Sequence, residues 1–371
     1  MRIAQIAALI TPDGAFGGPV RVAANQARTL AARGHDLELF AATSGFDTVP
    51  SEYDGVPLRA YSSRQLVPGT GFLGRWSSGL QKTLRSELST FDVVHIHMGR
   101  DMVTMAGGMA ARSAGTPYVL QTHGMVGPTS HPLGKPLDAL LTRRLLAGAA
   151  ARLYLTPREL GELHIVSRRK LDFQNVPNGV PEPTVTRKES LPPDVLFLAR
   201  LHERKRPLMF VEAARRLRAS GVDATFSLVG PDEGQGQAVA DEIRRIGDSS
   251  IRWEGAVAPE HTQERLARST VYALPSVDEP FPMSVLEALS LGLPTVVTDT
   301  CGLAPAIARH GAGVVIDDTV DALERALREL VGDDRRRYHT GKNALALVRD
   351  EFSMSAVAAR LEHIYAEAIR S

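Results

Sequence analysis

The chain has 371 residues, a formal net charge of +1 and a hydrophobic content of 43%. This length exceeds the usual size of one hydrophobic core and predicts two domains, and the near-zero net charge argues against a strongly electrostatic nucleic-acid binder. No stretch approaches the roughly 18 apolar residues that a membrane span needs. The single cysteine, Cys301, excludes an intrachain disulfide, and we expect a cytoplasmic protein.

Short apolar or β-branched runs alternate with helical patterns along the first half of the chain. Residues 2–7 fit a buried first strand better than a signal peptide, because a glycine-rich turn and a helix follow them. That helix is indicated by apolar residues that recur at helical spacing from Val20 to Ala31, and Gly34 ends it. Further strands are predicted at residues 37–41, 93–97, 118–121 and 153–155.

The second half repeats this alternation after a segment, residues 181–193, that is rich in proline and charge and is typical of an interdomain linker. Strands are predicted at residues 195–199, 225–229, 271–274, 295–298 and 313–316. The alternation favours two doubly wound α/β domains with parallel sheets. We place the first domain at residues 1–182 and the second at 183–355, and expect a C-terminal helix at 356–371 that packs back on the first domain.

Two glutamates spaced eight apart, Glu279 and Glu287, are the most informative feature of the second domain. Glu279 follows a predicted strand and Glu287 falls in the first turn of the next helix. Ligands bind outside the carboxyl ends of the strands in such sheets, and a helix N-terminus there suits a phosphate. A polyhydroxylated, phosphate-bearing ligand is therefore indicated. A capping box formed by Ser284 and Glu287 is an alternative that the pattern leaves open.

Basic residues follow the first strand of the same domain. Arg200 ends that strand and Lys205 lies on the loop or at the start of the next helix. A planar guanidinium and a compact ammonium together suit a diphosphate. For Arg204 and Arg206 we favour a solvated basic turn.

In the first domain, the turn from Gly14 to Pro19 joins the first strand to the first helix, but its glycines miss the spacing of a dinucleotide fingerprint. His123 follows another predicted strand and suits a sugar hydroxyl or a phosphate. His95 and His97 alternate on one strand without a convincing third ligand, so no metal site is expected.

Together these stretches resemble the retaining glycosyltransferases of family four, which have the GT-B fold of two Rossmann-like domains facing a cleft. The resemblance runs in order along about the whole chain, and its specific part is the Glu279–Glu287 block with its Gly-x-Pro tail. The matching stretches are Gly17-Gly18, Asp92-Val93-Val94-His95-Ile96-His97, Thr122-His123-Gly124, Val176-Pro177-Asn178-Gly179-Val180, Ala199-Arg200-Leu201, Leu274-Pro275-Ser276 and Gly292-Leu293-Pro294.

The resemblance implies a role for each matching position. Glu287 would accept hydrogen bonds from a ribose, Glu279 would face the donor sugar, and Arg200 with Lys205 would hold the diphosphate. Other donor contacts would come from the residues around the helix start and from two further segments: Phe281, Met283, Ser284, Val285, Gly17, Gly18 and Val257. His123 would bond the sugar's hydroxyls. The family commonly has glycine where this chain has Pro282, which has no N–H to donate.

The function implied is retaining transfer of a hexose-type sugar from a UDP- or GDP-sugar, without a metal or other cofactor, in polysaccharide or glycoconjugate biosynthesis. The acceptor would be a sugar, a lipid-linked molecule or a small molecule bound by the first domain. Trp76 could stack on a sugar or touch lipid, and the basic, apolar stretches near Arg143 and Arg168 could rest on an anionic membrane surface. For both features we favour the alternative of a helix core with solvated charges. Alternatives are a non-catalytic nucleotide-sugar-binding protein and a GT-B epimerase.

Overall fold

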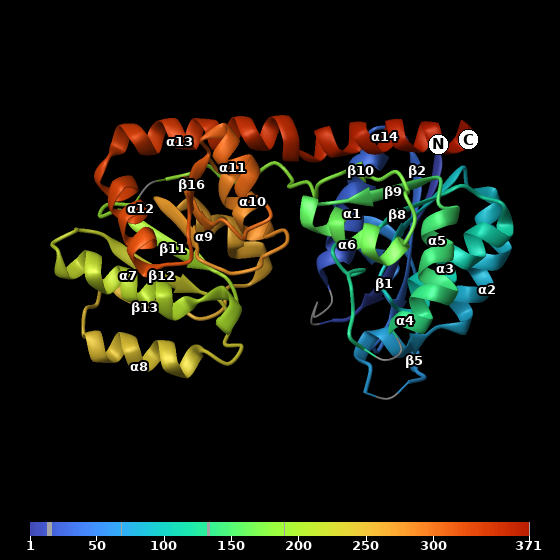
Figure 1. Cartoon of the computed structure of the whole chain (residues 1–371), viewed down its shortest axis with the longest axis horizontal. Coiled ribbons are helices and arrows are strands. Elements are labelled where there is room, and N and C mark those ends of the chain that lie inside the picture. The colour runs from blue at the N-terminus through green and yellow to red at the C-terminus, as the bar shows by residue number, and fades with distance from the viewer. Residues whose placement is uncertain (13–16, 68, 132–133, 189, 371) are drawn as a thin grey trace. The chain divides into compact units, whose positions relative to one another are not determined.

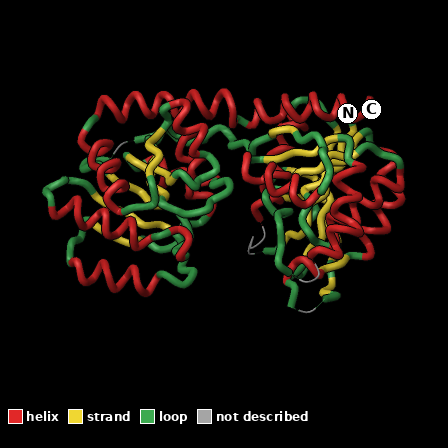
Figure 2. Tube along the Cα trace, in the orientation of Figure 1, coloured by secondary structure: helices red, strands yellow, loops and turns green. Residues whose placement is uncertain are grey.

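A computed structural model describes residues 1–12, 17–67, 69–131, 134–188 and 190–370. The chain forms two compact units: unit 1 comprises Met1–Gly179 with Met354–Ser371, and unit 2 comprises Val180–Ser353 (Figure 1). Each unit is a parallel sheet with helices around it (Figure 2). Among the described residues no helix is long and apolar enough to cross a membrane.

Unit 1 is built on an eight-stranded sheet with the order β10-β9-β8-β7-β1-β2-β4-β3, parallel throughout except for the pair β3 and β4. A two-stranded hairpin, β5 and β6, follows β4. The strands are β1 (Arg2–Ile10), β2 (Asp36–Thr43), β3 (Glu52–Tyr53), β4 (Val56–Ser62), β5 (Arg64–Gln65), β6 (Arg75–Trp76), β7 (Val93–His97), β8 (Tyr118–Gln121), β9 (Ala151–Tyr154) and β10 (Gln174–Asn175).

Helices cover both faces of this sheet. Side chains alternate along each strand, so successive residues of β1 pack against different helices. Ile3 of β1 faces one apolar cluster with α1 and α14, and Ala4 faces the other with α2, α3, α5 and α6. The helices are α1 (Gly17–Ala32), α2 (Ser78–Glu87), α3 (Met102–Ala114), α4 (Gly134–Leu137), α5 (Arg143–Gly148), α6 (Pro157–Ser167) and α14 (Met354–Arg370). The C-terminal helix α14 thus belongs to unit 1, and buries Leu361 and Tyr365 there.

Unit 2 has a six-stranded, wholly parallel sheet with the order β13-β12-β11-β14-β15-β16. Its strands are β11 (Asp194–Leu198), β12 (Thr225–Val229), β13 (Ile251–Trp253), β14 (Val271–Leu274), β15 (Thr295–Thr298) and β16 (Gly313–Ile316). Its helices are α7 (Pro207–Ala219), α8 (Gly236–Ile246), α9 (Thr262–Ala267), α10 (Met283–Ser290), α11 (Ala304–His310), α12 (Val320–Gly332) and α13 (Asp334–Leu347). The order places β11 and β14 side by side in the middle of the sheet.

The expected parallel α/β architecture is confirmed, and the apolar runs mark the central strands of both sheets. Six strands were not expected: β4, the three-residue β13, and the two-residue strands β3, β5, β6 and β10. Unit 1 ends at Gly179, before the proline-rich segment, so that segment belongs to unit 2. It is irregular but held in place, because the Arg187 guanidinium donates to the carbonyls of Gly292 at 3.0 Å and Thr270 at 3.1 Å.

Candidate active site

The main candidate site lies at the carboxyl edge of the unit 2 sheet, where β11 and β14 end. Because the two strands are parallel neighbours, the loops that follow them leave the same edge together. A backbone hydrogen bond of 3.0 Å joins these loops, donated by the Val277 amide to the Arg204 carbonyl. The topology therefore brings a basic loop and the Glu279 loop into contact, although they are separated by about seventy residues of chain.

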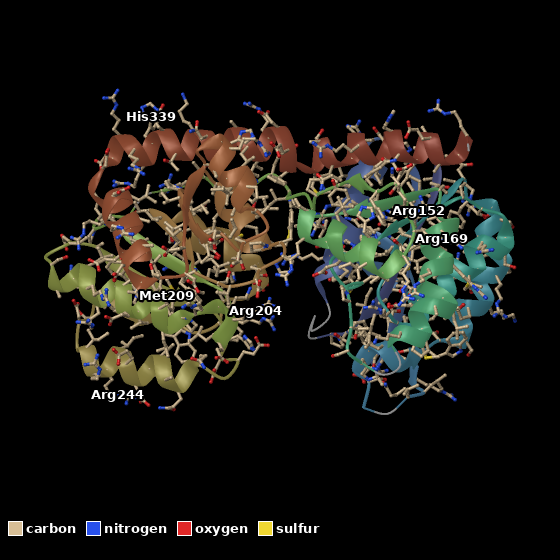
Figure 3. The ribbon with its side chains drawn as sticks, viewed as in Figure 1. Arg152, Arg169, Arg204, Met209, Arg244 and His339 are labelled. Carbon is tan, nitrogen blue, oxygen red and sulfur yellow. The ribbon has the colours of Figure 1, made fainter. Side chains whose placement is uncertain are left out.

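Glu279 is the centre of this contact. Its carboxylate is ion-paired with the Lys205 ammonium, and the Arg204 guanidinium lies 3.4 Å from the same oxygen. The side chains of Lys205 and Glu279 are only 14% and 11% exposed, whereas Arg204 is 47% exposed. Arg204 is labelled in Figure 3. Two cations next to one half-enclosed carboxylate leave a net positive charge at the edge of the sheet. Arg204, expected to be a solvated turn residue, is thus part of the cluster.

Helix α10 begins beside this cluster and offers two amides. Its N-cap residue is Pro282, whose side chain makes no capping bond and whose carbonyl accepts from the Val285 and Leu286 amides at 3.2 and 3.4 Å. The amides of Met283 and Ser284 occupy the first two helical positions and have no intrahelical acceptor. They can bind an anion, with the helix dipole favouring negative charge.

The capping alternative for Ser284 is wrong, because Ser284 lies inside the helix and not at its N-cap. Its hydroxyl is 2.8 Å from the hydroxyl of Tyr272, which in turn is 3.1 Å from the Leu198 carbonyl. A carbonyl can only accept, so Tyr272 donates to Leu198 and receives the Ser284 proton. Burial raises the pKa of Tyr272, which keeps this phenol neutral. Glu287 lies one turn further along α10 and is partly exposed.

The other residues expected in unit 2 lie on segments that follow strands of the same sheet. Arg200 follows β11, is 62% exposed and is paired with Glu233 at 2.5 Å. Phe281 packs edge-to-face on Phe352, with ring centroids 6.1 Å apart. Val257 follows β13 and is partly buried against the core of the unit.

Gly230 shows how tightly the loops at this edge are packed. A Cβ on Gly230 would stand 1.9 Å from the carbonyl oxygen of Ala199, at a φ of +150° that other residues rarely adopt. The loops after β11 and β12 therefore touch backbone to backbone, which fixes where the basic loop begins.

In unit 1, the structure places His123 at the end of a stack of three histidine rings. His95 and His97 alternate on β7 and stack with centroids 4.5 Å apart, and His97 stacks on His123 at 5.0 Å. His97 Nδ1 is 2.8 Å from His123 Nε2, and His95 Nδ1 is 2.7 Å from the Tyr365 hydroxyl. Burial lowers the pKa of His95 and of His123 to about 3, and that of His97 well below its usual range, so all three rings are neutral.

The neutral stack limits what His123 can do. A neutral imidazole has one N–H, so one of His97 and His123 donates to the other along their 2.8 Å contact. His97 therefore determines which nitrogen of His123 carries the proton. The sequence analysis considered His97 as a metal ligand and as part of a stretch that matches the family, and missed this contact.

Glu159 is the second functional candidate that the sequence missed. This carboxylate, buried on α6, accepts from the Thr122 hydroxyl at 2.5 Å and from the amides of Gly124 and Leu155, each at 2.6 Å. It holds both neighbours of His123, whose φ of +52° is unusual for a residue with a side chain. The pattern Thr156-x-x-Glu159 is a visible signal for a capping box, and Thr156 does cap α6.

The glycine-rich turn of unit 1 is only partly described. Gly14, Ala15 and Phe16 lie outside the described residues. Gly17 is the first residue of α1, and a Cβ on Gly18 would meet no atom within 4 Å. Packing within unit 1 therefore gives no reason for glycine at position 18.

No group of three or more potential metal ligands occurs among the described residues. Burial also raises the pKa of Cys301 to about 12, so this thiol stays protonated near neutral pH. The chemistry available at the unit 2 edge is therefore that of Glu279, the two cations beside it and the α10 amides.

Comparison with known proteins gives the same two-part division. Residues 192–333 match the family model for glycosyl transferases group 1, and residues 17–179 match the model for the glycosyl transferase 4-like domain. The chain is 26% identical to a D-inositol 3-phosphate glycosyltransferase of Thermobispora bispora, over 99% of the chain and 95% of that protein. It is 25% identical to the UDP-Gal:alpha-D-GlcNAc-diphosphoundecaprenol alpha-1,3-galactosyltransferase of Escherichia coli, over 95% of each.

Among solved structures, the Anabaena protein HepE in complex with UDP and glucose superposes with a TM-score of 0.75. The match covers 99% of each chain at 16% sequence identity. It confirms the GT-B fold that the sequence predicted, with two Rossmann-like domains.

Proposed function

We propose that this chain, which belongs to the group 1 glycosyltransferases, transfers a hexose-type sugar from a UDP- or GDP-sugar to an acceptor hydroxyl with retention of configuration. The observation that carries the proposal is the unit 2 edge, where Lys205 and Arg204 meet the Glu279 carboxylate and α10 begins four residues later along the chain. These groups match the parts of a nucleotide-sugar: cations and amides for the diphosphate, a carboxylate for hydroxyl groups.

The donor assignment places Glu287 on the ribose, Lys205 on the diphosphate and Glu279 at the sugar ring. Arg200 joins the diphosphate when it leaves Glu233, an exposed partner whose ion pair contributes little. Phe281 and Val257 would shape the pocket for sugar and base. Gly17 and Gly18 are the donor-binding candidates of unit 1. The solved HepE complexes contain UDP, UDP with glucose, or UDP-glucose, and that chemistry is the basis for choosing a nucleotide-sugar.

For the chemical step we infer front-face departure and attack. The bond from the anomeric carbon to the diphosphate breaks, the acceptor oxygen forms a bond on the same face, and a diphosphate oxygen takes the acceptor's proton. Lys205 stabilises the charge that develops on the leaving diphosphate. Glu279 is paired with two cations rather than free to attack, which favours this route over double displacement. The cations do the work that a metal would do, so we infer no metal requirement.

Unit 1 is proposed to bind the acceptor: a sugar, a lipid-linked molecule or a small molecule. The relatives' names mention a phosphorylated cyclitol and a diphosphoundecaprenol-linked sugar, and both kinds fit this range. Exposed apolar residues on the β5–β6 hairpin, namely Leu66, Val67 and Leu73, favour peripheral contact with the inner membrane surface.

The test is nucleotide release from UDP-, GDP- and ADP-sugars in the presence of a chelator, with and without sugar acceptors. We expect release from one donor above the others, and a product whose anomeric configuration by NMR equals that of the donor. Lys342, an exposed lysine of α13, gives a matched control variant for Lys205, since Lys342→Met removes the same charge from the same unit. Nucleotide-sugar affinity without release would instead indicate a binding protein, and an isomer made without acceptor would indicate an epimerase.

A further inference from the structure

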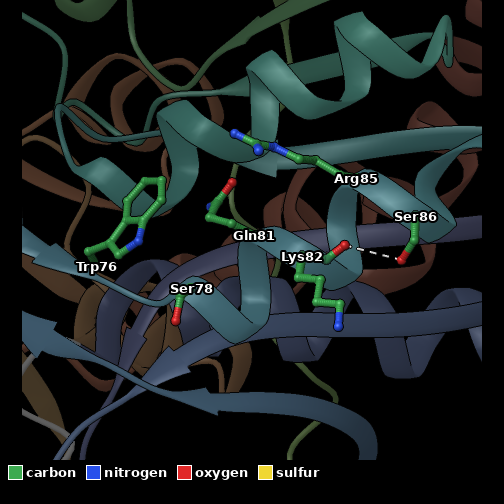
Figure 4. Close-up of a pocket in the computed structure, with 6 residues that line it drawn as sticks. All are labelled: Trp76, Ser78, Gln81, Lys82, Arg85 and Ser86. Carbon is green, nitrogen blue, oxygen red and sulfur yellow. Dashed lines mark hydrogen bonds between the residues drawn. The ribbon is translucent and has the colours of Figure 1, made fainter.

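Unit 1 carries a hollow of about 410 Å³ that is separate from the histidine stack and the glycine-rich turn. It is lined by Trp76, Ser78, Gln81, Lys82, Arg85 and Ser86 (Figure 4). All but Trp76 lie on α2 at helical spacing. Figure 4 shows the Trp76 indole at one end, Ser86 at the other and Gln81 between them, with the Arg85 guanidinium extending toward Gln81 and the Lys82 ammonium pointing to the opposite side.

The topology connects this hollow to the ligand-binding edge of unit 1. β4 runs parallel to β2, which runs parallel to β1, so β4 ends at the carboxyl edge of the sheet. The β5–β6 hairpin follows there, and α2 starts at that edge with Ser78, two residues after Trp76. Ligands of doubly wound sheets bind at this edge. The end of the hollow with Trp76 and Ser78 therefore lies at the ligand-binding edge, and its remaining lining residues follow along α2.

Two charges in the hollow lack a partner. Lys82 and Arg85 are exposed, and no carboxylate of the described residues pairs with either of them. By contrast, Arg59, whose side chain also meets α2, is bound by both oxygens of Glu87 at 3.0 Å. The hollow is thus locally positive although the whole chain is almost neutral, which favours a ligand that carries negative charge.

Gln81 lies beneath the hollow. It is 4% exposed, and its Nε2 is buried without an acceptor among the described atoms. Because this nitrogen is closed off from solvent, the charged and aromatic groups that a ligand in the hollow can reach are Lys82, Arg85 and Trp76. Trp76 is partly buried at the end of the hollow and offers an aromatic face against which a sugar ring can stack.

We propose that this hollow is an acceptor subsite for an acidic saccharide, with the sugar ring on Trp76 and its carboxylate or phosphate between Lys82 and Arg85. The subsite rests on the proposed glycosyl transfer for its role as an acceptor site, but its ligand binding does not depend on turnover. An acidic group here would orient the acceptor and select charged acceptors over neutral ones.

Binding is measured without donor, on the full chain, by the NMR signal of the Trp76 indole N–H. The chain has two tryptophans, and the other, Trp253, donates to the Gly230 carbonyl at 3.0 Å within unit 2, so it is an internal reference. The probes are cellobiouronic acid and its neutral analogue cellobiose. We expect the acidic disaccharide to shift the Trp76 signal. It should bind about 5- to 20-fold more tightly than cellobiose, which is the range that two solvent-facing charge pairs allow. This difference in affinity should become smaller at high salt.

The double variant K82Q/R85Q should lose this preference and keep the thermal stability of the wild type, because both side chains are exposed. Arg112→Gln is the matched control: Arg112 is also an exposed cation of unit 1, at the far end of α3. Equal binding of both disaccharides, no response of Trp76, or a response only to vesicles that contain anionic lipid would overturn the proposal. A Trp76 response without turnover from any donor would refute the proposed function and leave the subsite standing.

Discussion

Replacing Glu159 by glutamine tests whether the buried carboxylate positions His123. The carboxylate accepts three hydrogen bonds, and Oε1 alone accepts two of them, from Thr122 and Gly124. The amide of Glu159→Gln can keep those two, but its NH₂ then faces the Leu155 N–H, donor against donor. We expect a loss of roughly 1.5–3 kcal/mol in the free energy of unfolding, because a charge-assisted bond in a buried site is removed.

That loss corresponds to a fall of roughly 3–12 °C in Tm for a unit of this size. Hydrogen exchange should quicken at the Gly124 and Leu155 amides. Because a displacement of about 1 Å can reduce a rate by about 100-fold, we expect kcat to fall by roughly 10- to 100-fold. The affinity for free UDP should not change, since the nucleotide groups are assigned to unit 2.

Glu162→Gln is the control for this variant. Glu162 is one turn further along α6 and pairs with the exposed Arg158, a contact that contributes at most about 1 kcal/mol. A Glu159→Gln variant with the same turnover and the same Gly124 exchange as Glu162→Gln would refute the positioning argument. A loss of stability without a change in kcat would leave Glu159 a structural residue only.

Further outcomes follow from the same contacts. Lys205→Met should lower kcat by about 10- to 150-fold, through loss of a charged contact worth roughly 1.5–3 kcal/mol, while Lys342→Met leaves kcat unchanged; equal rates in both would remove Lys205 from the site. Glu287→Ala should weaken UDP-sugar binding, measured by calorimetry, by a similar factor; unchanged affinity would contradict the ribose assignment. Gly18→Ala should slow turnover while Tm stays the same or rises, because the position is helical and open; normal turnover would refute ligand approach there. Burial depresses the pKa of His95 from about 6.5 to about 3, so its contribution to stability is complete above pH 6.5 and declines as pH falls. Because burial lowers the pKa of His97 and His123 in the same direction, urea unfolding should show a total loss of at least about 2 kcal/mol from pH 7 to pH 5, and equal stability at both would contradict the burial argument.

The sequence predicted the sheets well where strands are central. Runs such as Val271–Leu274 are buried on both faces and read as continuous apolar stretches. β4 was missed because it contains Pro57 and because only its first residues alternate between buried and exposed. β13 was missed because three residues give too short a pattern for periodicity to detect.

For the site, the sequence predicted the edge but not the partners. Because parallel strands end together, the spacing of Glu279 and Lys205 after two strands was enough to place them at one edge. Which cations meet the carboxylate depends on the loop path between His202 and Arg206, and a short 3₁₀ turn with a left-handed Arg206 decides it. No periodicity or propensity predicts such a path.

Two similar sequence patterns in this chain lead to different local structures. Ser284-x-x-Glu287 and Thr156-x-x-Glu159 both fit a capping box. Thr156 caps its helix, yet Glu159 bonds the loop after β8 and the Leu155 amide. Ser284 does not cap at all, because Pro282 occupies the N-cap. The sequence pattern is the same, and the outcome differs because it depends on where the preceding loop meets the helix.

Pro282 is the point at which this chain departs from the family pattern, and the fold explains how the site accommodates it. Proline removes one amide, but the residue is buried and its carbonyl receives two helix amides, which fixes the start of α10. The Met283 and Ser284 amides remain for a ligand anion, so the diphosphate contacts do not depend on the missing donor. The lost donor lies next to Phe281, the residue that we propose shapes the sugar pocket. A Pro282→Gly variant should therefore change the preference among sugars attached to one nucleotide while leaving the affinity for the free nucleotide unchanged.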